Sequence, residues 1–218
     1  MQLEQFDVLA PEACAHWAQQ VMALRRQWTA RHARLPFYTL GLAAYLDAVS
    51  DGSSRGLPPS YHSTVLRQHN NQVLSQHFEA LLDINRRALS QHLQRPARYV
   101  PTQAALPGFH IHLPHPAFAA EVASVHRDLQ FMKVFPQQDF QPDQVITFTL
   151  PLSLPPGSGL QIWDDAGPSV HPYQLGQMVV HDGLHQHQAV LHPTPSDVPR
   201  IMLQGHGVLL HDELLLYW

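Results

Sequence analysis

The feature that most constrains the fold of this 218-residue chain is the series of short apolar segments, separated by Pro and Gly, that begins after Pro96. The segments are, in chain order, GFHIHL, SVHRDLQFMKVF, QVITFTLPLSL, GLQIW, LGQMVVHDG, HQAVL, RIMLQGHGVLL and ELLLYW. Apolar runs of this length between turn signals are typical of an antiparallel sandwich or barrel and not of βαβ units. The 19 prolines also argue against an all-helical bundle, because an interior Pro removes a backbone donor and breaks a helix.

The first hundred residues show helical periodicity instead. Five apolar residues recur at intervals of three and four, which lines one helical face: Cys14, Trp17, Val21, Leu24 and Trp28. A short apolar helix is predicted over residues 39–48, ended by the breaker-rich segment 50–56. A long amphipathic helix is predicted from Leu74 to Leu93, before Pro96. We therefore expect an α+β fold in one domain over residues 1–218, with a helical N-terminal region at 1–98 and a β core at 99–218.

Composition restricts the partners and the compartment. Charged residues make up 14% of the chain and the net charge is −4, with one Lys, Lys133, against 12 Arg. No basic face large enough for nucleic acid is expected, because that affinity comes mainly from neutralising phosphates. The one cysteine, Cys14, excludes an intramolecular disulfide and a multi-cysteine metal site. Neither a signal peptide nor an apolar run of membrane-spanning length is recognised, so a soluble cytoplasmic protein is expected.

Histidine is the residue type that carries the chemistry. Eleven of the 17 histidines lie between His110 and the C-terminus. The phosphate-loop, Gly-x-Ser-x-Gly and His-Glu-x-x-His motifs are absent from the sequence. Imidazole is the commonest ligand of transition metals, so the distribution of histidines favours a metal site in the β half.

The most informative fragment is His126-Arg127-Asp128. Residues two apart on a strand point to the same face, so His126 and Asp128 could reach one ion together. A histidine from another strand would complete a 2-His-1-carboxylate triad, which holds ferrous iron and leaves open positions for an oxidant and a co-substrate.

In the order of these segments, the β half resembles the 2-oxoglutarate/Fe(II)-dependent oxygenases, a family with a double-stranded β-helix, or jelly-roll, core. The resemblance covers about residues 105–218, from PGFHIHL through SVHRDLQF, ITFTLPLSL and LGQMVVHDG to PRIMLQGHG. It implies that His126 and Asp128 bind Fe(II). The distal ligand in this family often lies four residues after a Phe-Asp-Gly sequence; the counterpart here is His181-Asp182-Gly183, which points to His187. His185 remains a rival, because it would share a strand face with His187.

The resemblance also implies a cation for the distal carboxylate of 2-oxoglutarate, the co-substrate. Arg200 is the only basic residue other than histidine after Lys133, and an arginine fork can bind a carboxylate through two hydrogen bonds. Gln130, Thr147 and Thr149 are further candidates for contacts with the co-substrate, chosen by strand parity. His110 and His112 are expected in a pocket wall.

The implied reaction is the oxidation of a small molecule by dioxygen, with release of succinate and CO₂. Because Asp128 supplies a carboxylate, hydroxylation or a related desaturation or cyclisation is expected, and not halogenation. A cupin-like metal enzyme would use the His-x-His pairs at 110/112 and 185/187, but the following glutamate is distant in both cases. That enzyme and a non-catalytic jelly-roll binding module remain the alternatives; the substrate and the oligomeric state stay open.

Overall fold

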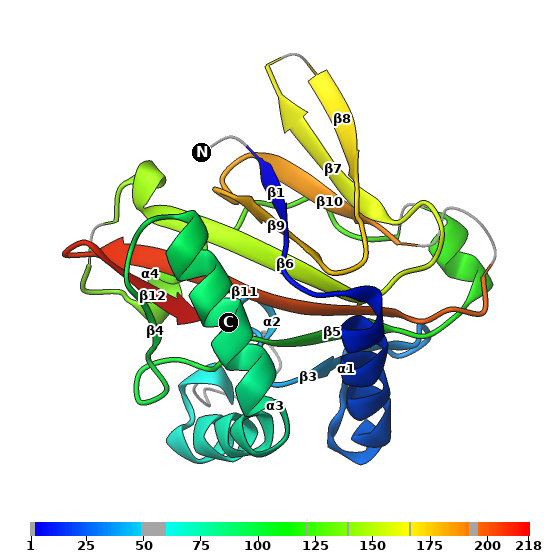
Figure 1. Ribbon diagram of the computed structural model, residues 1–218, viewed down its shortest axis with the longest axis horizontal. Coiled ribbons are helices and arrows are strands. Elements are labelled where there is room, and N and C mark those ends of the chain that lie inside the picture. The colour runs from blue at the N-terminus through cyan, green and yellow to red at the C-terminus, as the bar shows by residue number, and fades with distance from the viewer. Residues whose placement is uncertain (1–2, 49–59, 121, 139, 166, 192–195) are drawn as a thin grey trace.

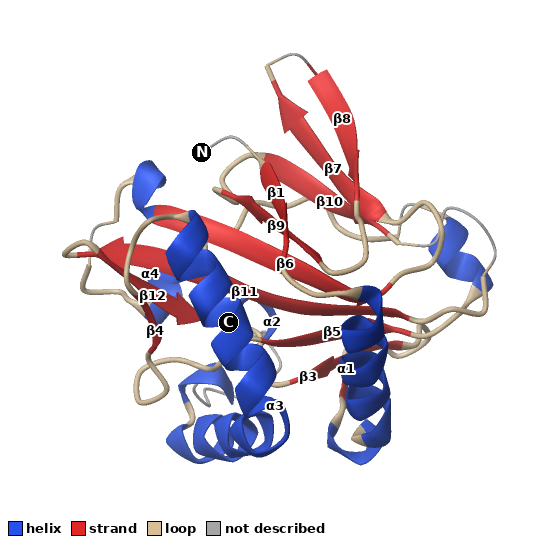
Figure 2. Cartoon of the chain, viewed as in Figure 1, coloured by secondary structure: helices blue, strands red, loops and turns tan. Residues whose placement is uncertain are grey.

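The computed structural model describes residues 3–48, 60–120, 122–138, 140–165, 167–191 and 196–218. Two sheets of the described residues face each other, and helices α1 and α3 lie on the outer side of the larger sheet (Figures 1 and 2). The α-helices are α1 (Pro11–Ala23), α2 (Ala44–Asp47), α3 (Thr64–His92) and α4 (Phe131–Val134). The arrangement confirms the α+β class with a jelly-roll core.

The larger sheet has nine strands among the described residues. Its main path runs β1 (Glu4–Asp7), β9 (Gln177–His181), β6 (Val145–Ser153), β11 (Arg200–Leu210), β5 (Gly108–His112), β3 (Phe37–Leu40) and β2 (Thr29–Ala30). β12 (Glu213–Tyr217) pairs with β11 and, in parallel, with β4 (Ala97–Tyr99). The smaller sheet has the order β10 (Gln186–Val190), β7 (Gly159–Asp164) and β8 (Gly167–Pro172), at the top of Figure 1.

Alternation along the central strands gives the larger sheet two different faces. One face packs against the helices and belongs to the main hydrophobic core: Phe109, Ile111, Phe148, Leu150, Ile201 and Leu203. The other face turns toward the smaller sheet and carries His110, Thr147, Thr149, Arg200 and Gln204. Burying a Leu, Ile or Phe side chain contributes about 1.5–3 kcal/mol. Because a one-residue slip would exchange the two faces, this burial fixes the strand register.

Helices α1 and α3 cover the apolar face of the larger sheet. Cys14 and Val21 of α1 are fully buried, as the spacing predicted, but α1 ends at Ala23 and the chain continues in a 3₁₀ turn over Arg25–Gln27. α3 contains the predicted amphipathic helix and begins ten residues before Leu74. Its N-terminus is capped by Ser63, whose hydroxyl accepts a hydrogen bond from the Leu66 N–H at 3.4 Å.

Three details of the predicted secondary structure are wrong. Residues 37–40 form β3 and only Ala44–Asp47 is helical, because β3 pairs with β5 and Gly41 then takes a positive φ of 111°. The N-terminal region also contributes β1 and β2 to the larger sheet. SVHRDLQFMKVF is not a strand: His126 makes an isolated bridge and Phe131–Val134 is helical.

The breaker segment 50–56 lies outside the described residues. The one-domain organisation and its division at residue 98 stay predictions, and strands from both sides of that position share the larger sheet.

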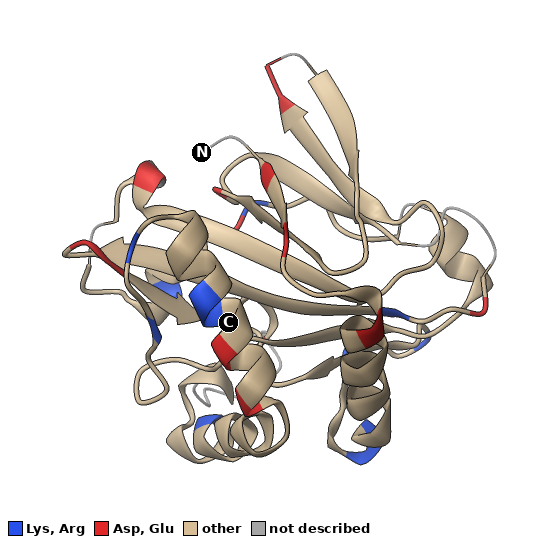
Figure 3. Cartoon of the chain, viewed as in Figure 1, with Lys and Arg blue, Asp and Glu red and all other residues tan. Residues whose placement is uncertain are grey.

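Charged residues of both signs are scattered over the described elements, and α3 carries both (Figure 3). Among the described residues, no helix combines the length and apolar character needed to cross a membrane.

Candidate metal centre

A cavity of about 300 Å³ lies between the two sheets. The larger sheet contributes its polar face, through His110, Thr147, Thr149 and Arg200, and the smaller sheet contributes Leu160, His187 and Ala189. Residues 31–46 line the cavity from the N-terminal region, with Arg31, Phe37 and Tyr45 among them. The cavity is therefore formed by parts of the chain that are far apart in sequence.

A backbone bridge holds His126 beside His187. The N–H of His126 donates to the carbonyl oxygen of His187 at 3.0 Å, and the N–H of His187 donates to the carbonyl of His126 at 2.9 Å. The two imidazole centroids lie 4.4 Å apart. The pair extends the smaller sheet by one bridge, so two histidines that are distant in sequence present their rings at the same place.

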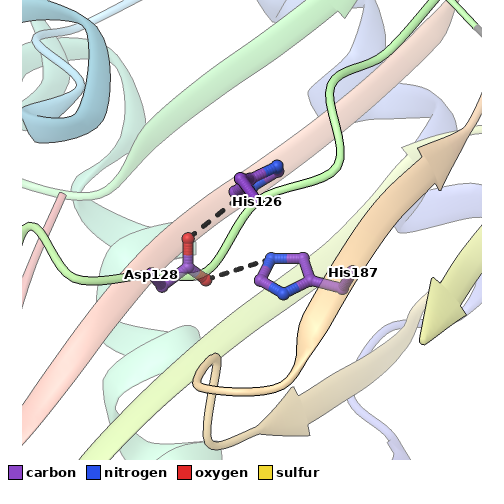
Figure 4. A group of neighbouring side chains, drawn as sticks. All are labelled: His126, Asp128 and His187. Atoms are coloured by element: carbon purple, nitrogen blue, oxygen red, sulfur yellow. Dashed lines mark ion pairs between the residues drawn. The ribbon is translucent and has the colours of Figure 1, made fainter. Parts of the chain in front are cut away.

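Asp128 lies against both histidines (Figure 4). Its Oδ1 is 3.7 Å from Nε2 of His126, and its Oδ2 is 3.3 Å from Nε2 of His187. The backbone N–H of Asp128 donates to the carbonyl of Gly183 at 2.7 Å. Gly183 has a φ of +69°, and a Cβ built there would lie 2.5 Å from Thr147 Oγ1 and 2.8 Å from Asp128 Cβ. The close approach of Asp128 therefore requires glycine at position 183.

The tautomers of the two histidines leave their Nε2 lone pairs facing the carboxylate. Nδ1 of His126 lies 2.9 Å from the carbonyl oxygen of Ser124, and Nδ1 of His187 lies 2.9 Å from that of His185. A carbonyl oxygen only accepts, so each Nδ1 carries a proton. A neutral imidazole then has a lone pair on Nε2, and a cation or an additional proton is needed between these lone pairs and the oxygens of Asp128.

This is the arrangement of a metal site. One ligand atom from each of His126, Asp128 and His187 lies within 4.8 Å of the others, and this is the one group of three His, Cys, Asp or Glu residues of that kind in the described part of the chain. Two imidazole nitrogens and one carboxylate on one face, beside an open cavity, fit ferrous iron with positions left for further ligands. Asp128 and His187 are buried, whereas the His126 side chain is 38% exposed.

Local charges favour the ionised form of Asp128. Burial alone would raise its pKa, but the hydrogen bond with His187 and the neighbouring imidazoles outweigh burial and hold the pKa well below its usual range. For His187, burial would lower the pKa, but Asp128 outweighs it and the pKa is raised. The carboxylate is thus ready to bind a cation, and a proton on His187 competes with that cation.

A chain of hydrogen bonds supports Asp128 from behind. The Thr147 hydroxyl donates to Asp128 Oδ2 at 2.6 Å and accepts from Nδ1 of His206 at 3.0 Å. The Gln130 amide Nε2 lies 2.6 Å from Nε2 of His206, to which it donates. His206 is 1% exposed, and burial lowers its pKa to about 4, so it is neutral at pH 7.

Thr147 lies on the cavity face that strand parity suggested, whereas Gln130 does not. Thr147 lines the cavity, but its hydroxyl is bonded to Asp128. Gln130 is not among the residues that line the cavity, because residues 127–130 are not a strand and its side chain turns toward His206. Thr147 therefore contacts Asp128 directly, and Gln130 is linked to Asp128 through His206 and Thr147.

Arg200 provides an uncompensated positive charge in the same cavity. Its side chain is 3% exposed, its Nε has no hydrogen-bond partner, and no carboxylate pairs with it among the described residues. Its guanidinium carbon lies 5.6 Å from the centroid of Tyr173, which is hydrogen-bonded to Thr149. Burial lowers the pKa of Arg200 from its usual value, which shows that its charge is costly in the absence of an anion.

The rival histidines have other positions. His185 is 57% exposed and its Nδ1 lies 3.2 Å from Oδ1 of Asp182. His181 lines the cavity, but its Nδ1 accepts a hydrogen bond from the Gly183 N–H. His110 and His112 lie in the cavity wall, as expected. The described structure thus favours His187 over His185 and joins neither His-x-His pair as a cupin-like site.

Sequence reasoning missed several cavity residues. Tyr45 and Arg31 come from the region that was predicted to be helical, and Tyr173 follows β8, which was not predicted as a strand. His206 lies six residues after Arg200 on β11, so the two side chains share one face of the strand. This even spacing is the sequence signal that could have identified His206.

Comparison with known proteins supports the fold alone. Neither a protein-family model nor a curated protein sequence matches this chain. An N-substituted L-amino acid dioxygenase of Burkholderia ambifaria, solved with α-ketoglutarate, aligns with 99% of this chain and 86% of its own length at 10% identity, with a TM-score of 0.57. A 2OG-Fe(II) oxygenase family oxidoreductase of Burkholderia pseudomallei aligns with 93% and 83% at 12% identity, with a TM-score of 0.50. The resemblance seen in the sequence is confirmed as a shared fold.

Proposed function

We propose that this chain, which has the fold of the 2-oxoglutarate/Fe(II)-dependent oxygenases, is itself a non-haem oxygenase of that type and hydroxylates a small molecule in the cytoplasm. The observation that carries the proposal is the convergence of His126, Asp128 and His187 beside a cavity that also holds the uncompensated Arg200. A metal-binding group alone would suit many functions. A buried guanidinium without an anion, in the same cavity, specifically supports an acidic co-substrate.

The donor set fits ferrous iron. His126 and His187 would bind through Nε2, because their Nδ1 atoms donate to backbone carbonyls. Asp128 would bind through its carboxylate, held in orientation by Thr147. Such hydrogen bonds to the ligands fix their direction and typically change metal affinity by about 10–100-fold.

The co-substrate would be held at both ends. Its keto acid end would bind the metal, and the distal carboxylate would meet the Arg200 fork, which can donate two parallel hydrogen bonds. Tyr173 lies against the guanidinium, and Thr149, which is hydrogen-bonded to Tyr173, is a hydroxyl candidate for a further contact. Binding of the anion would remove the cost of the buried charge of Arg200.

When bound, Fe(II) and 2-oxoglutarate supply an oxidant from dioxygen, with release of succinate and CO₂. The chain contributes orientation and exclusion of water: Leu160, Phe118 and Leu191 make part of the wall apolar, which disfavours water beside the reacting atoms. Asp128 fills the third protein position on the metal, so we favour hydroxylation over the transfer of a halide.

The experiment is an anaerobic titration of the protein with Fe(II) and 2-oxoglutarate, followed by the visible charge-transfer band of the chelate. We expect a saturable band in the wild-type protein, none in Asp128→Ala or His187→Ala, and a much weaker one in Arg200→Ala. His185→Ala is the matched control, because it removes an exposed histidine two residues from His187 and should leave the titration unchanged.

An unchanged band in Asp128→Ala would place the metal elsewhere. A wild-type protein that forms no band would rule out the oxygenase and leave a non-catalytic jelly-roll module. Succinate release that depends on added substrate is the second readout of the activity.

A further inference from the structure

The fixed charges that line the cavity are few. Among the described lining residues they are Asp128, Arg200 and Arg31. In the proposed function, the ferrous ion and Arg200 together balance Asp128 and the two carboxylates of 2-oxoglutarate. The charge of Arg31 is therefore the one that decides what else the cavity can bind.

Arg31 is already neutralised by Asp47. Its two terminal nitrogens donate to the two carboxylate oxygens of Asp47, each at 2.7 Å, and its Nε donates to Thr39 Oγ1 at 2.7 Å. The side chains of Arg31 and Asp47 are 10% and 8% exposed. A bidentate, nearly buried pair of this kind presents little net charge to the cavity.

Two histidines on this side of the cavity, His32 and His110, are neutral. Nδ1 of His32 accepts hydrogen bonds from the N–H groups of Arg34 and Leu35, at 3.1 and 2.9 Å, so it carries no proton. His110 is 8% exposed, and burial together with Arg200 and Arg31 lowers its pKa to about 3. A carboxylate or phosphate of a second bound molecule would therefore meet no free cation at Arg31, His32 or His110, and its burial there would be unfavourable.

The same side of the cavity offers flat apolar surfaces. Phe37 stacks on His112 with a centroid distance of 4.4 Å and an interplanar angle of 3°, and Phe118 meets His112 edge-on at 5.3 Å. Leu35 and Leu46 complete this wall. Aromatic walls of this kind favour a ring, which can pack against them in offset or edge-on geometry.

One polar group in this region faces the metal centre. The Tyr45 hydroxyl lies 2.8 Å from Nε2 of His110, and the His110 side chain is also hydrogen-bonded to Gln204. With Gln204 accepting from His110, Nε2 accepts from Tyr45, which leaves the lone pairs of the Tyr45 oxygen free to accept from a ligand. The Tyr45 ring is nearly parallel to His126, at an angle of 10° and a centroid distance of 6.4 Å.

We propose that the substrate is an uncharged, ring-containing small molecule, whose ring packs against Phe37, His112 and Phe118 and whose hydrogen-bond donor meets Tyr45. This inference rests on the proposed function, because it assigns Asp128 and Arg200 to the metal and the co-substrate. The cavity volume of about 300 Å³ is at the lower end of the range for ligand pockets and must also hold the co-substrate, which restricts the substrate to a small molecule.

The test uses matched pairs of probes on one skeleton: benzamide and benzoate, phenylacetamide and phenylacetate, indole-3-acetamide and indole-3-acetate. Each is added to wild-type protein loaded anaerobically with Fe(II) and 2-oxoglutarate. Binding is measured by the change in the charge-transfer band and by the rise in Tm. We expect amides to bind, and each carboxylate to bind about tenfold or more weakly, because its charge is uncompensated.

Two variants test the cause of that preference. Asp47→Asn keeps a hydrogen-bond acceptor but releases the charge of Arg31, so the preference for amides should shrink or reverse. Arg31→Gln removes the cation and leaves Asp47 unpaired, so carboxylates should bind even more weakly than to wild type. Should Asp47→Asn fail to form the band and be unfolded, Arg31→Gln alone decides the matter.

The outcomes separate the two proposals. If wild-type protein forms no band with Fe(II) and 2-oxoglutarate, the proposed function fails and this inference with it. If the band forms but carboxylates bind as well as amides, or no probe of either kind binds, the uncharged ring substrate is overturned and the oxygenase stands.

Discussion

Replacing Arg200 with methionine should make the ligand-free protein more stable while abolishing its response to 2-oxoglutarate. The guanidinium is 3% exposed, its Nε lacks a partner, and no carboxylate pairs with it in the described ranges. Arg200→Met keeps an unbranched side chain and removes the charge. If Arg200 stabilised the fold, its replacement would lower the free energy of unfolding. The direction of the change in stability therefore separates a binding role from a structural one.

The magnitude follows from two opposing effects. Replacing a poorly compensated buried charge with an apolar side chain of similar length stabilises proteins by about 1–4 kcal/mol. The contact between Arg200 and Tyr173, 5.6 Å from the ring centroid, is lost, which costs about 0.5–2 kcal/mol. A net gain of about 1–2 kcal/mol in the free energy of unfolding remains. For a chain of this size that gain corresponds to a rise in Tm of about 2–8 °C.

The assay is thermal unfolding of the ligand-free protein, and of the metal-loaded protein with and without 2-oxoglutarate. At a 2-oxoglutarate concentration of about 100 times the wild-type Kd, the metal-loaded wild type should gain about 2.7 kcal/mol from the co-substrate and Arg200→Met far less, so the order of stability reverses on adding 2-oxoglutarate. Arg98→Met is the control: Arg98 is 53% exposed and paired with Glu213, and its replacement should change stability by about 1 kcal/mol or less. A ligand-free Arg200→Met protein that is less stable than wild type would refute the reasoning.

Three further predictions concern the residues around the metal and the cavity wall. Gly183→Ala should lower the affinity for Fe(II) at least about tenfold, because the new Cβ would overlap Thr147 and Asp128. Gly167→Ala is the control: a Cβ at that position meets nothing within 4 Å, so the same titration should give an unchanged affinity. Thr147→Val should weaken Fe(II) binding by about 10–100-fold, and Thr147→Ser should bind like wild type, because only serine keeps the hydrogen bond to Asp128. Equal Fe(II) affinities of the valine and serine variants in a competition titration would contradict this. Burial lowers the pKa of His110 to about 3, whereas its value in the unfolded chain is about 6.5. The unfolded state therefore takes up the proton first, and the free energy of unfolding falls as the pH drops below about 6.5. At pH 5 the loss should be about 2 kcal/mol. Denaturant unfolding should show a shallower loss in His110→Gln, and an unchanged pH dependence would exclude His110 as its source.

Local sequence determined the features that depend on neighbours in the chain. The alternation of β5, β6 and β11 could be predicted because the two faces of a strand follow from a period of two, and it placed Thr149 and Arg200 toward the cavity. The proximity of His126 and Asp128 was predicted from their spacing of two residues, although His126 makes an isolated bridge and the segment is not a strand. The helical period located α1 and α3 for the same reason.

Residues 37–40 show where local pattern failed. A short apolar run suits either a helix or a strand, and the choice was made by hydrogen bonds from β3 to β5, about seventy residues away. That choice brought Phe37 beside His112 and shaped the aromatic wall of the cavity.

The sequence by itself determined a helical N-terminal region, an antiparallel β sandwich or barrel, and the candidates His126, Asp128 and Arg200, because these follow from periodicity, spacing and residue type. The jelly roll was implied by the resemblance in the order of the segments. Only the tertiary structure decided that His187 and not His185 meets Asp128, since a backbone bridge to His126 sets which ring turns inward. The tertiary structure also decided that the Thr147 hydroxyl donates a hydrogen bond to Asp128 and that Asp47 forms an ion pair with Arg31. Such pairings depend on distances between residues far apart in the chain, which no local pattern encodes.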